Sequence, residues 1–231
     1  LKQAIAALVC MAFPAWSPLH AQTNPESEKL AAEVPIADVH FHVETRFSPA
    51  DMVALFDRLN VRWAGGVGPI GVFPAAWAAR PAFIQAMGNR YIPTSGQEMN
   101  RMYFQGGVRA LEDAENPVFR ALLEQAESEF KAGTLKGFGE LHTNNSRSNP
   151  NPQFRRKMRT DAPTIRALYQ LAGKYGGFLQ IHLEADRDSI EQLEALAAIE
   201  PRAPVILAHC GTDATARVIR GLMERHANLY C

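Results

Sequence analysis

The chain has 231 residues, of which 47% are hydrophobic and 21% are charged. This composition is that of an ordinary globular protein that can bury one sizeable core, so we expect one main domain. Lys and Arg together number 24, as do Asp and Glu. The formal charge of zero gives no general attraction to nucleic acid or to an anionic membrane, so any charged partner must be recognised locally.

The first 21 residues differ from the rest of the chain. Lys2 precedes an apolar run from residue 4 to 13, and small and turn-forming residues follow as far as Ala21. This order is typical of a secretory signal peptide and predicts an exported protein, periplasmic or secreted. A lipid anchor on Cys10 is disfavoured, because Val9 stands where a small residue is expected. The run is shorter than the roughly 20 residues that cross a bilayer, and no later segment is long enough, so we expect no membrane span.

Residues 22–34 are polar and acidic and are predicted to form a linker. From residue 35 onward, short β-rich runs alternate with segments of helical periodicity. Seven strands are predicted, at residues 36–43, 61–67, 91–93, 134–142, 178–183, 204–209 and 228–231. Two helices are expected at 97–111 and 117–131, and a long polar loop at 143–160. Strict alternation predicts right-handed βαβ units and a parallel sheet.

The first predicted strand carries two histidines, in the sequence Asp38-Val39-His40-Phe41-His42. Because side chains alternate along a strand, His40 and His42 point to the same face, where two imidazoles can bind one ion. On its own, this pair is explained equally well by two hydrogen-bonded histidines in a partly buried strand.

Two further histidines, His182 and His209, stand at the ends of the apolar runs that begin at residues 178 and 204. Such runs are typical of strands that are buried on both faces. In a parallel barrel the C-terminal ends of the strands meet at one mouth, where active sites are built. Burying several polar rings there is costly unless they are satisfied, and a divalent metal satisfies them. The four histidines therefore predict a metal site.

Glu140 and His142 lie at the end of the fourth predicted strand, in Gly137-Phe138-Gly139-Glu140-Leu141-His142. Glu140 is predicted to join the metal cluster or to bridge a second ion, and the alternative is a structural ion pair. His142 shares the face of Glu140 one step farther along the strand. We expect it either to bind substrate or to face water, and the sequence favours neither.

Other polar residues have simpler expectations. The cluster Arg155, Arg156, Lys157 and Arg159 can attract a carboxylate substrate, with Arg155 as the predicted substrate-binding residue, although a solvated loop is the more common explanation. His226 lies on an apolar helical stripe near a helix end, which predicts a structural role. Cys210 and Cys231 are expected to be packed thiols, although an exported compartment would permit them to pair.

The segment Gly66-Val67-Gly68-Pro69-Ile70-Gly71 matches the spacing of a dinucleotide-binding loop. Its context does not match, because prolines at 69 and 74 interrupt the helix that should begin there and no acidic residue closes a second strand. These glycines are instead expected to let the second strand–helix loop run close to the site.

Taken in order, these motifs resemble the amidohydrolase superfamily: His-x-His on a first strand, Gly-Phe-Gly-Glu on a fourth, a His closing a fifth and Ala-His-Cys-Gly closing a sixth. The sequence is most similar to the amidohydrolase-related branch, which includes decarboxylases and lactonases of small carboxylic acids. The resemblance covers residues 36–231. It implies a TIM-type (β/α)8 barrel domain over residues 35–231, incomplete and with about seven strands present.

The resemblance also implies roles for individual residues. His40, His42 and His182 match the family's metal-binding histidines. His209 matches a histidine that binds metal in some members and orients the attacking water or the substrate in others, and Glu140 is similar to the fourth-strand carboxylate of binuclear members. His209 and Glu140 are thus the catalytic candidates, and the implied cofactor is a divalent metal, expected to be zinc, as one or two ions.

One feature of the family has no match in residues 1–231, namely the eighth-strand aspartate that binds metal and takes a proton from the nucleophilic water. We therefore expect a fragment or a truncated gene product with an open barrel. The implied reaction is hydrolysis of an amide, ester or lactone of a small-molecule substrate by metal-activated water. Decarboxylation at the same metal and a non-catalytic, metal-binding barrel remnant are the alternatives, and the sequence leaves the substrate and a homo-oligomer open.

Overall fold

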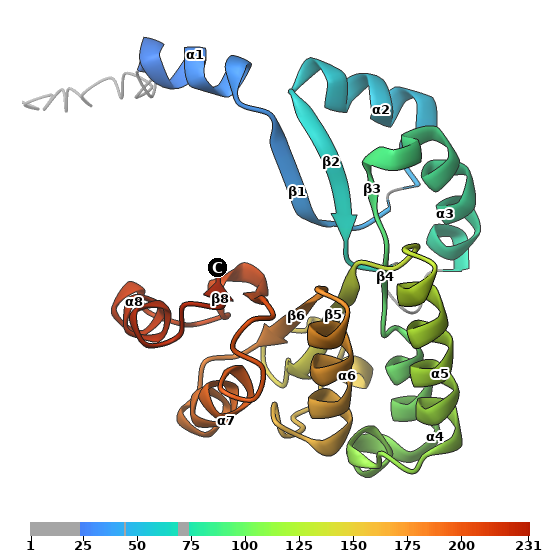
Figure 1. The fold of residues 1–231 in the computed structure, drawn as a ribbon, viewed down its shortest axis with the longest axis vertical. Coiled ribbons are helices and arrows are strands. Elements are labelled where there is room, and N and C mark those ends of the chain that lie inside the picture. Colours follow the sequence, from blue (N-terminus) through green and yellow to red (C-terminus); the bar gives the residue numbers. More distant parts are fainter. Residues whose placement is uncertain (1–23, 44, 69–73) are drawn as a thin grey trace, which may run out of the picture.

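The computed structural model describes residues 24–43, 45–68 and 74–231, so the predicted signal peptide over residues 1–21 lies outside the described residues. The described chain is an α/β protein in which every strand pair is parallel. Three strands form one sheet in the order β1-β2-β3, and five form a second in the order β4-β5-β6-β7-β8 (Figure 1). The predicted parallel α/β architecture is confirmed.

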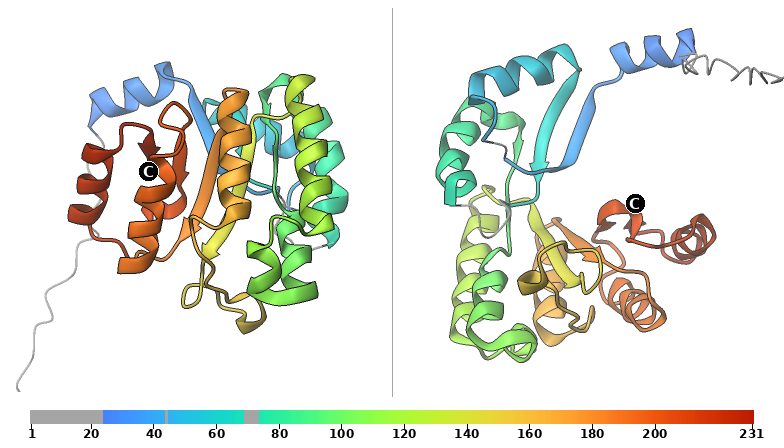
Figure 2. Two further views of the ribbon diagram at one scale, coloured as in Figure 1. Left: turned by 60° about the horizontal axis from the view of Figure 1, so that its bottom comes forward. Right: turned by 180° about the vertical axis from the view of Figure 1, so that it is seen from behind.

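The strands are β1 (Ile36–Phe41), β2 (Val61–Gly66), β3 (Tyr91–Ile92), β4 (Thr94–Ser95), β5 (Gly137–Asn144), β6 (Phe178–Leu183), β7 (Val205–Leu207) and β8 (Leu229–Tyr230). The helices are α1 (Pro25–Glu33), α2 (Pro49–Arg58), α3 (Pro74–Met87), α4 (Glu98–Glu112), α5 (Pro117–Lys131), α6 (Pro163–Lys174), α7 (Arg187–Ala197) and α8 (Ala216–Arg225). Neighbouring strands follow the order of the chain. They lie along a curved arrangement with the helices on its outer side, and β1 and β8 are at its two ends (Figure 2).

The third predicted strand is divided between the two sheets. Tyr91 and Ile92 pair with β2, whereas Thr94 and Ser95 pair with β5. Pro93 stands between the two pairs, and a proline cannot donate a hydrogen bond to a sheet. Its carbonyl oxygen instead accepts a bond from the backbone N–H of Lys136 at 2.9 Å. The chain therefore passes from the first sheet to the second at Pro93, the residue that cannot donate a backbone hydrogen bond to either.

Two hydrophobic cores hold these elements. The larger one lies between β4–β8 and helices α4–α7 and contains fully buried residues such as Phe119, Phe138, Ile165, Leu168, Leu179 and Leu193. In the smaller core, the Phe41 ring of β1 packs against Phe56 of α2 and Phe83 of α3, at centroid distances of 5.1 and 5.2 Å. Because side chains alternate along a strand, this packing of Phe41 turns His40 and His42 to the opposite face.

Two hydrogen bonds join the two sheets. Gly68, just after β2, donates its N–H to the carbonyl oxygen of Gly139 in β5 at 3.1 Å, and the Gln180 side chain of β6 donates to the carbonyl oxygen of Val39 in β1 at 2.8 Å. A side chain at Gly66 would collide with the backbone of Val39. Gly66 and Gly68 thus lie close to β1 and β5, whereas residues 69–73 of the predicted loop lie outside the described residues.

The segment predicted as a linker contains helix α1. Asn24 caps it by accepting the N–H of Glu26 at 3.0 Å, Pro25 occupies its first turn, and none of its residues is buried. At the other end, the Asn60 side chain donates to the carbonyl oxygens of Ala31, Ala32 and Val34. Capping at both ends favours a helix although no apolar face is buried.

The end of the chain departs from the prediction at two places. The sixth predicted strand, 204–209, ends at Leu207, and Ala208–Cys210 form a 3-10 turn. Cys210 and Cys231 are joined by a disulfide, so the expectation of packed thiols is wrong. The turn after β7 and the residue after β8 approach because these two strands are neighbours in the sheet. Among the described residues, no helix combines the length and the apolar character needed to cross a bilayer.

Candidate metal centre

Glu140 of β5 lies among five histidines that come from four places in the chain. Its side chain is 4% exposed. One carboxylate oxygen, Oε2, lies 3.6 Å from the Nε2 atoms of His40, His42 and His142. The other, Oε1, lies 2.7 Å from Nδ1 of His182 and 3.4 Å from Nε2 of His209. The structure therefore brings together all five residues of the predicted metal set and adds His142.

The register of the strands explains why these side chains meet. His142 and His182 are direct partners in the β5–β6 pair, and their ring centroids are 4.8 Å apart. His40 and His42 approach from β1 and from the residue just after it, and their rings are 5.1 Å apart. His209 follows β7 in a left-handed backbone conformation, with φ of 55°, and its ring lies 4.7 Å from that of His40. The carboxyl ends of the parallel strands thus converge on one point.

Two of the histidines have a fixed partner on the side away from Glu140. Nδ1 of His42 lies 2.9 Å from the carbonyl oxygen of Gly68, which can only accept, so this nitrogen carries the hydrogen. Nε2 of His42 is then bare and faces Glu140. Nε2 of His182 lies 3.2 Å from the Ser148 hydroxyl oxygen. Histidines that bind metals usually have such a partner on the second ring nitrogen.

Burial and mutual contacts set the charges of the cluster. Burial raises the pKa of Glu140, but the contacts with the surrounding imidazoles, led by the hydrogen bond from His182, outweigh it and hold that pKa well below its ordinary value. Burial lowers the pKa of His142 to about 3 and also lowers the pKa of His40. The centre therefore combines an ionised carboxylate with the neutral imidazoles of His40 and His142, a donor set that divalent zinc and similar metals bind.

The donor atoms also fit an ion in their spacing. In two groups that share Glu140, the ligand atoms all lie within 4.8 Å of one another: His40, His42 and Glu140, and Glu140, His142 and His182. Nδ1 of His40 is buried and has no hydrogen-bond partner among the described residues. These residues can therefore hold one metal ion or two. His209 belongs to neither group, and its side chain is 51% exposed at the rim.

The structure does not bring Arg155 to this centre. Arg155 is exposed, and its guanidinium Nε donates to the carbonyl oxygen of Asn149 at 2.8 Å. Its predicted role in substrate binding stays a prediction. The arginine of the same cluster that does reach the centre is Arg156, which the sequence did not single out from its neighbours.

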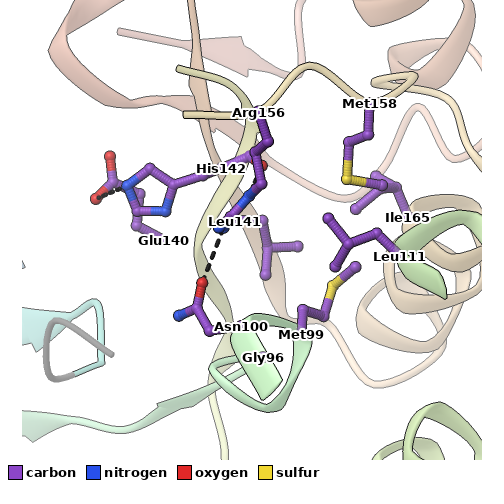
Figure 3. A pocket seen from close by; sticks show the side chains of 10 residues that line it. All are labelled: Gly96, Met99, Asn100, Leu111, Glu140, Leu141, His142, Arg156, Met158 and Ile165. Carbon is purple, nitrogen blue, oxygen red and sulfur yellow. Dashed lines mark hydrogen bonds and ion pairs between the residues drawn. The ribbon is translucent and has the colours of Figure 1, made fainter. Parts of the chain in front are cut away.

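Arg156 is buried and lines a small pocket together with Glu140 and His142. Its Nε donates to the carbonyl oxygen of His142 at 3.1 Å, and a terminal nitrogen donates to the side-chain oxygen of Asn100 at 2.9 Å. Figure 3 shows the His142 ring turned toward the Glu140 carboxylate and Arg156 reaching Asn100. Arg156 thus fixes the end of β5 beside the cluster.

Two further predictions can be placed. His226, expected to be structural, caps the end of α8, and its Nε2 lies 3.3 Å from a carboxylate oxygen of Glu194. His142, expected to bind substrate or face water, lies as close to Glu140 as His40 and His42 do. Glu184 was missed, although the two-residue period after His182 places it on the same side of β6.

No protein-family model matches this chain, and no curated protein matches it significantly. A proposal about function therefore rests on the residues of the centre and on their geometry.

Proposed function

We propose that the chain is a metal-dependent hydrolase of the amidohydrolase type, whose centre holds one or two divalent ions, with zinc as the first candidate. The observation that carries this proposal is the convergence of His40, His42, His142 and His182 on the buried carboxylate of Glu140. Five polar side chains at one point inside a parallel α/β protein are costly to bury unless an ion satisfies them.

The fold supports the same proposal. The strands follow one another in chain order and in parallel, and the cluster lies where their carboxyl ends meet. We infer that they form part of a TIM-type barrel, in which that end carries the active site. A small molecule is the expected substrate, because the balanced charge of the chain offers no general attraction to nucleic acid.

Individual residues have different proposed roles in hydrolysis. A bound divalent ion would lower the pKa of water toward about 7 and polarise the carbonyl of an amide, ester or lactone. His40 and His42 with Glu140, and Glu140 with His142 and His182, are the two groups of residues that would hold such an ion. Oε1 of Glu140 also contacts His209, whose half-exposed ring links the buried carboxylate to solvent and can pass a proton between them.

Metal analysis of the purified chain tests this proposal. After removal of metals with a chelator and titration with zinc or manganese, the protein should bind one or two ions and hydrolyse at least one member of a panel of lactones, amides and esters. The double variant His40→Ala/His42→Ala should lose the activity and at least one ion, because two ligands are removed. His226→Ala is the matched control, since His226 contacts Glu194 and not the cluster.

Each outcome has a distinct meaning. Metal binding without hydrolysis of any panel member would contradict the hydrolase and favour a metal-binding protein without catalysis. Release of carbon dioxide from a carboxylated aromatic would favour the decarboxylase alternative. A wild-type chain that binds no ion, or a double variant that keeps every ion, would refute the centre itself.

A further inference from the structure

A second buried carboxylate, Glu184, lies next to the centre and does not contact it. It follows β6, two residues after His182, and is fully buried. Its Oε1 accepts the backbone N–H groups of Arg147 at 2.6 Å and Ser148 at 2.5 Å. Its Oε2 accepts the hydroxyl of Ser146 at 2.9 Å and lies 3.2 Å from Nε of Arg147. One carboxylate thus binds three consecutive residues of the turn after β5.

These contacts fix the turn strongly. A buried carboxylate is stable only if its oxygens are satisfied, and hydrogen bonds to a charged acceptor are about twice as strong as those between neutral groups. Opening the turn would therefore leave a buried carboxylate without its hydrogen-bond partners.

The turn places one side chain on the centre. The Ser148 hydroxyl oxygen lies 3.2 Å from Nε2 of His182, while Nδ1 of His182 lies 2.7 Å from Glu140. The imidazole is thus held at both nitrogens. The carbonyl oxygen of Gly68 occupies the same position relative to His42, at its second nitrogen. A hydroxyl can donate to a bare ring nitrogen or accept from a protonated one, so Ser148 can hold Nε2 while Nδ1 donates to Glu140 and also when Nδ1 binds a metal.

We propose that Ser148 is a positioning residue for His182, and that Glu184 holds Ser148 in place through the backbone of the turn. This inference rests on the proposed metal centre, in which His182 is a ligand. Arg147 links the same turn to a second segment of the centre. Its guanidinium donates to the carboxylate of Asp213 at 3.1 Å, and Asp213 lies in the segment that follows His209. The turn after β5 therefore connects the segments that carry two of the cluster histidines.

The test separates positioning from a merely structural role. Ser148 is exposed, so Ser148→Ala removes only the hydroxyl and should leave thermal unfolding of the metal-free chain unchanged. Zinc affinity, measured by competition with a chromogenic chelator, should fall about 10-fold, as for other partners of metal-binding histidines. Ser148→Thr, which keeps the hydroxyl, should restore the affinity. Ser128→Ala, an exposed serine in α5, is the matched control and should bind zinc as the wild type does.

A spectroscopic readout checks the contact between Ser148 and His182. In the zinc-loaded chain, 15N spectra of the histidine rings should show the His182 hydrogen on Nε2, and Ser148→Ala should shift the Nε2 resonance because its hydrogen-bond partner is lost. Glu184→Gln, which keeps the size of the side chain, should weaken zinc binding and also lower thermal stability, because buried N–H groups lose a charged acceptor.

The possible failures are distinguishable. If the wild-type chain binds zinc and Ser148→Ala binds it equally tightly with an unchanged Nε2 resonance of His182, the positioning role is wrong while the metal centre stands. If the wild-type chain binds no zinc at all, the proposed function is refuted and the role of Ser148 with it.

Discussion

The environment of one carboxylate dominates the chemistry of this protein at the scale of single residues. Glu140 has two oxygens that face different groups: Oε2 faces His40, His42 and His142, whereas Oε1 faces His182 and His209. A carboxylate with this arrangement can bind one ion with one oxygen or bridge two ions with both. One ion requires the histidines of only one of the two groups that share Glu140, whereas two ions require the histidines of both groups.

Arg156 supports the cluster from outside, and its removal gives a prediction for stability. Arg156→Ala would leave the carbonyl oxygen of His142 and the side chain of Asn100 without their donor and would remove a cation from the face of Tyr103, 5.0 Å away. We expect the free energy of unfolding to fall by about 2 kcal/mol, as is common when a buried hydrogen-bonded group is lost. Urea unfolding of the metal-free chain measures this.

The neighbouring residue provides the control. Arg155 is exposed, and Arg155→Ala should change the free energy of unfolding by less than about 0.5 kcal/mol. Equal effects of the two substitutions would contradict the assignment of Arg156 as the arginine that supports the centre.

At the scale of elements, capping residues place the loops that surround the centre. Asp186 begins α7 by accepting the N–H of Ser189 at 3.0 Å, and its other oxygen lies 2.9 Å from Nζ of Lys157 and accepts from the side chain of Asn144 at 2.8 Å. One side chain therefore caps a helix and also connects the ends of β5 and β6 with the long polar loop. The start of α7 is fixed relative to the rim of the site.

Asp186 also gives a prediction with a defined pH window. Burial raises its pKa, but the N–H of Ser189 and the ammonium of Lys157 outweigh it and lower the pKa from 3.8 to about 2. Because the folded pKa lies below the unfolded one, the stabilisation is present above about pH 4 and is lost as the pH falls through about 2. At neutral pH, Asp186→Ala should lower the free energy of unfolding by about 1 kcal/mol, typical of a lost helix cap.

Urea unfolding at a series of pH values checks this. The difference between wild type and Asp186→Ala should shrink steadily below pH 4. Asp188→Ala, an exposed residue in the same first turn, should change the free energy of unfolding by less than about 0.5 kcal/mol. A difference for Asp186→Ala that stays constant with pH would show that its charge contributes nothing.

Periodicity and chain order predict much of these elements, and local backbone detail explains what they miss. The two-residue period along a strand places His40 with His42 and Glu140 with His142, and the structure confirms both pairs. The turn around His209 is missed, because an apolar run ending in histidine is compatible with a strand until the backbone is known to turn left-handed there. Arg155 and Arg156 look equivalent in sequence, and only burial distinguishes them.

At the scale of the whole molecule, the centre depends on residues that are distant in the chain. His40 and Glu140 are separated by two complete strand–helix units, and they meet because β1 and β5 are joined through the loop after β2 and through Gln180. A metal ion that binds Glu140 and the histidines of β1 would connect the smaller sheet to the larger one. Binding of metal and stability of the whole chain should therefore be coupled.

The disulfide near β8 gives a prediction for the thermal stability of the whole chain. The disulfide between Cys210 and Cys231 joins the turn that carries His209 to the residue after β8, across 21 positions in sequence. A cross-link of this span stabilises a protein by about 3 kcal/mol, because it restricts the unfolded chain. Reductant should therefore lower the midpoint of thermal unfolding, and Cys210→Ala/Cys231→Ala should show the same lowered midpoint and no further response to reductant. Titration that finds two free thiols at Cys210 and Cys231 in the native, unreduced protein would contradict the link.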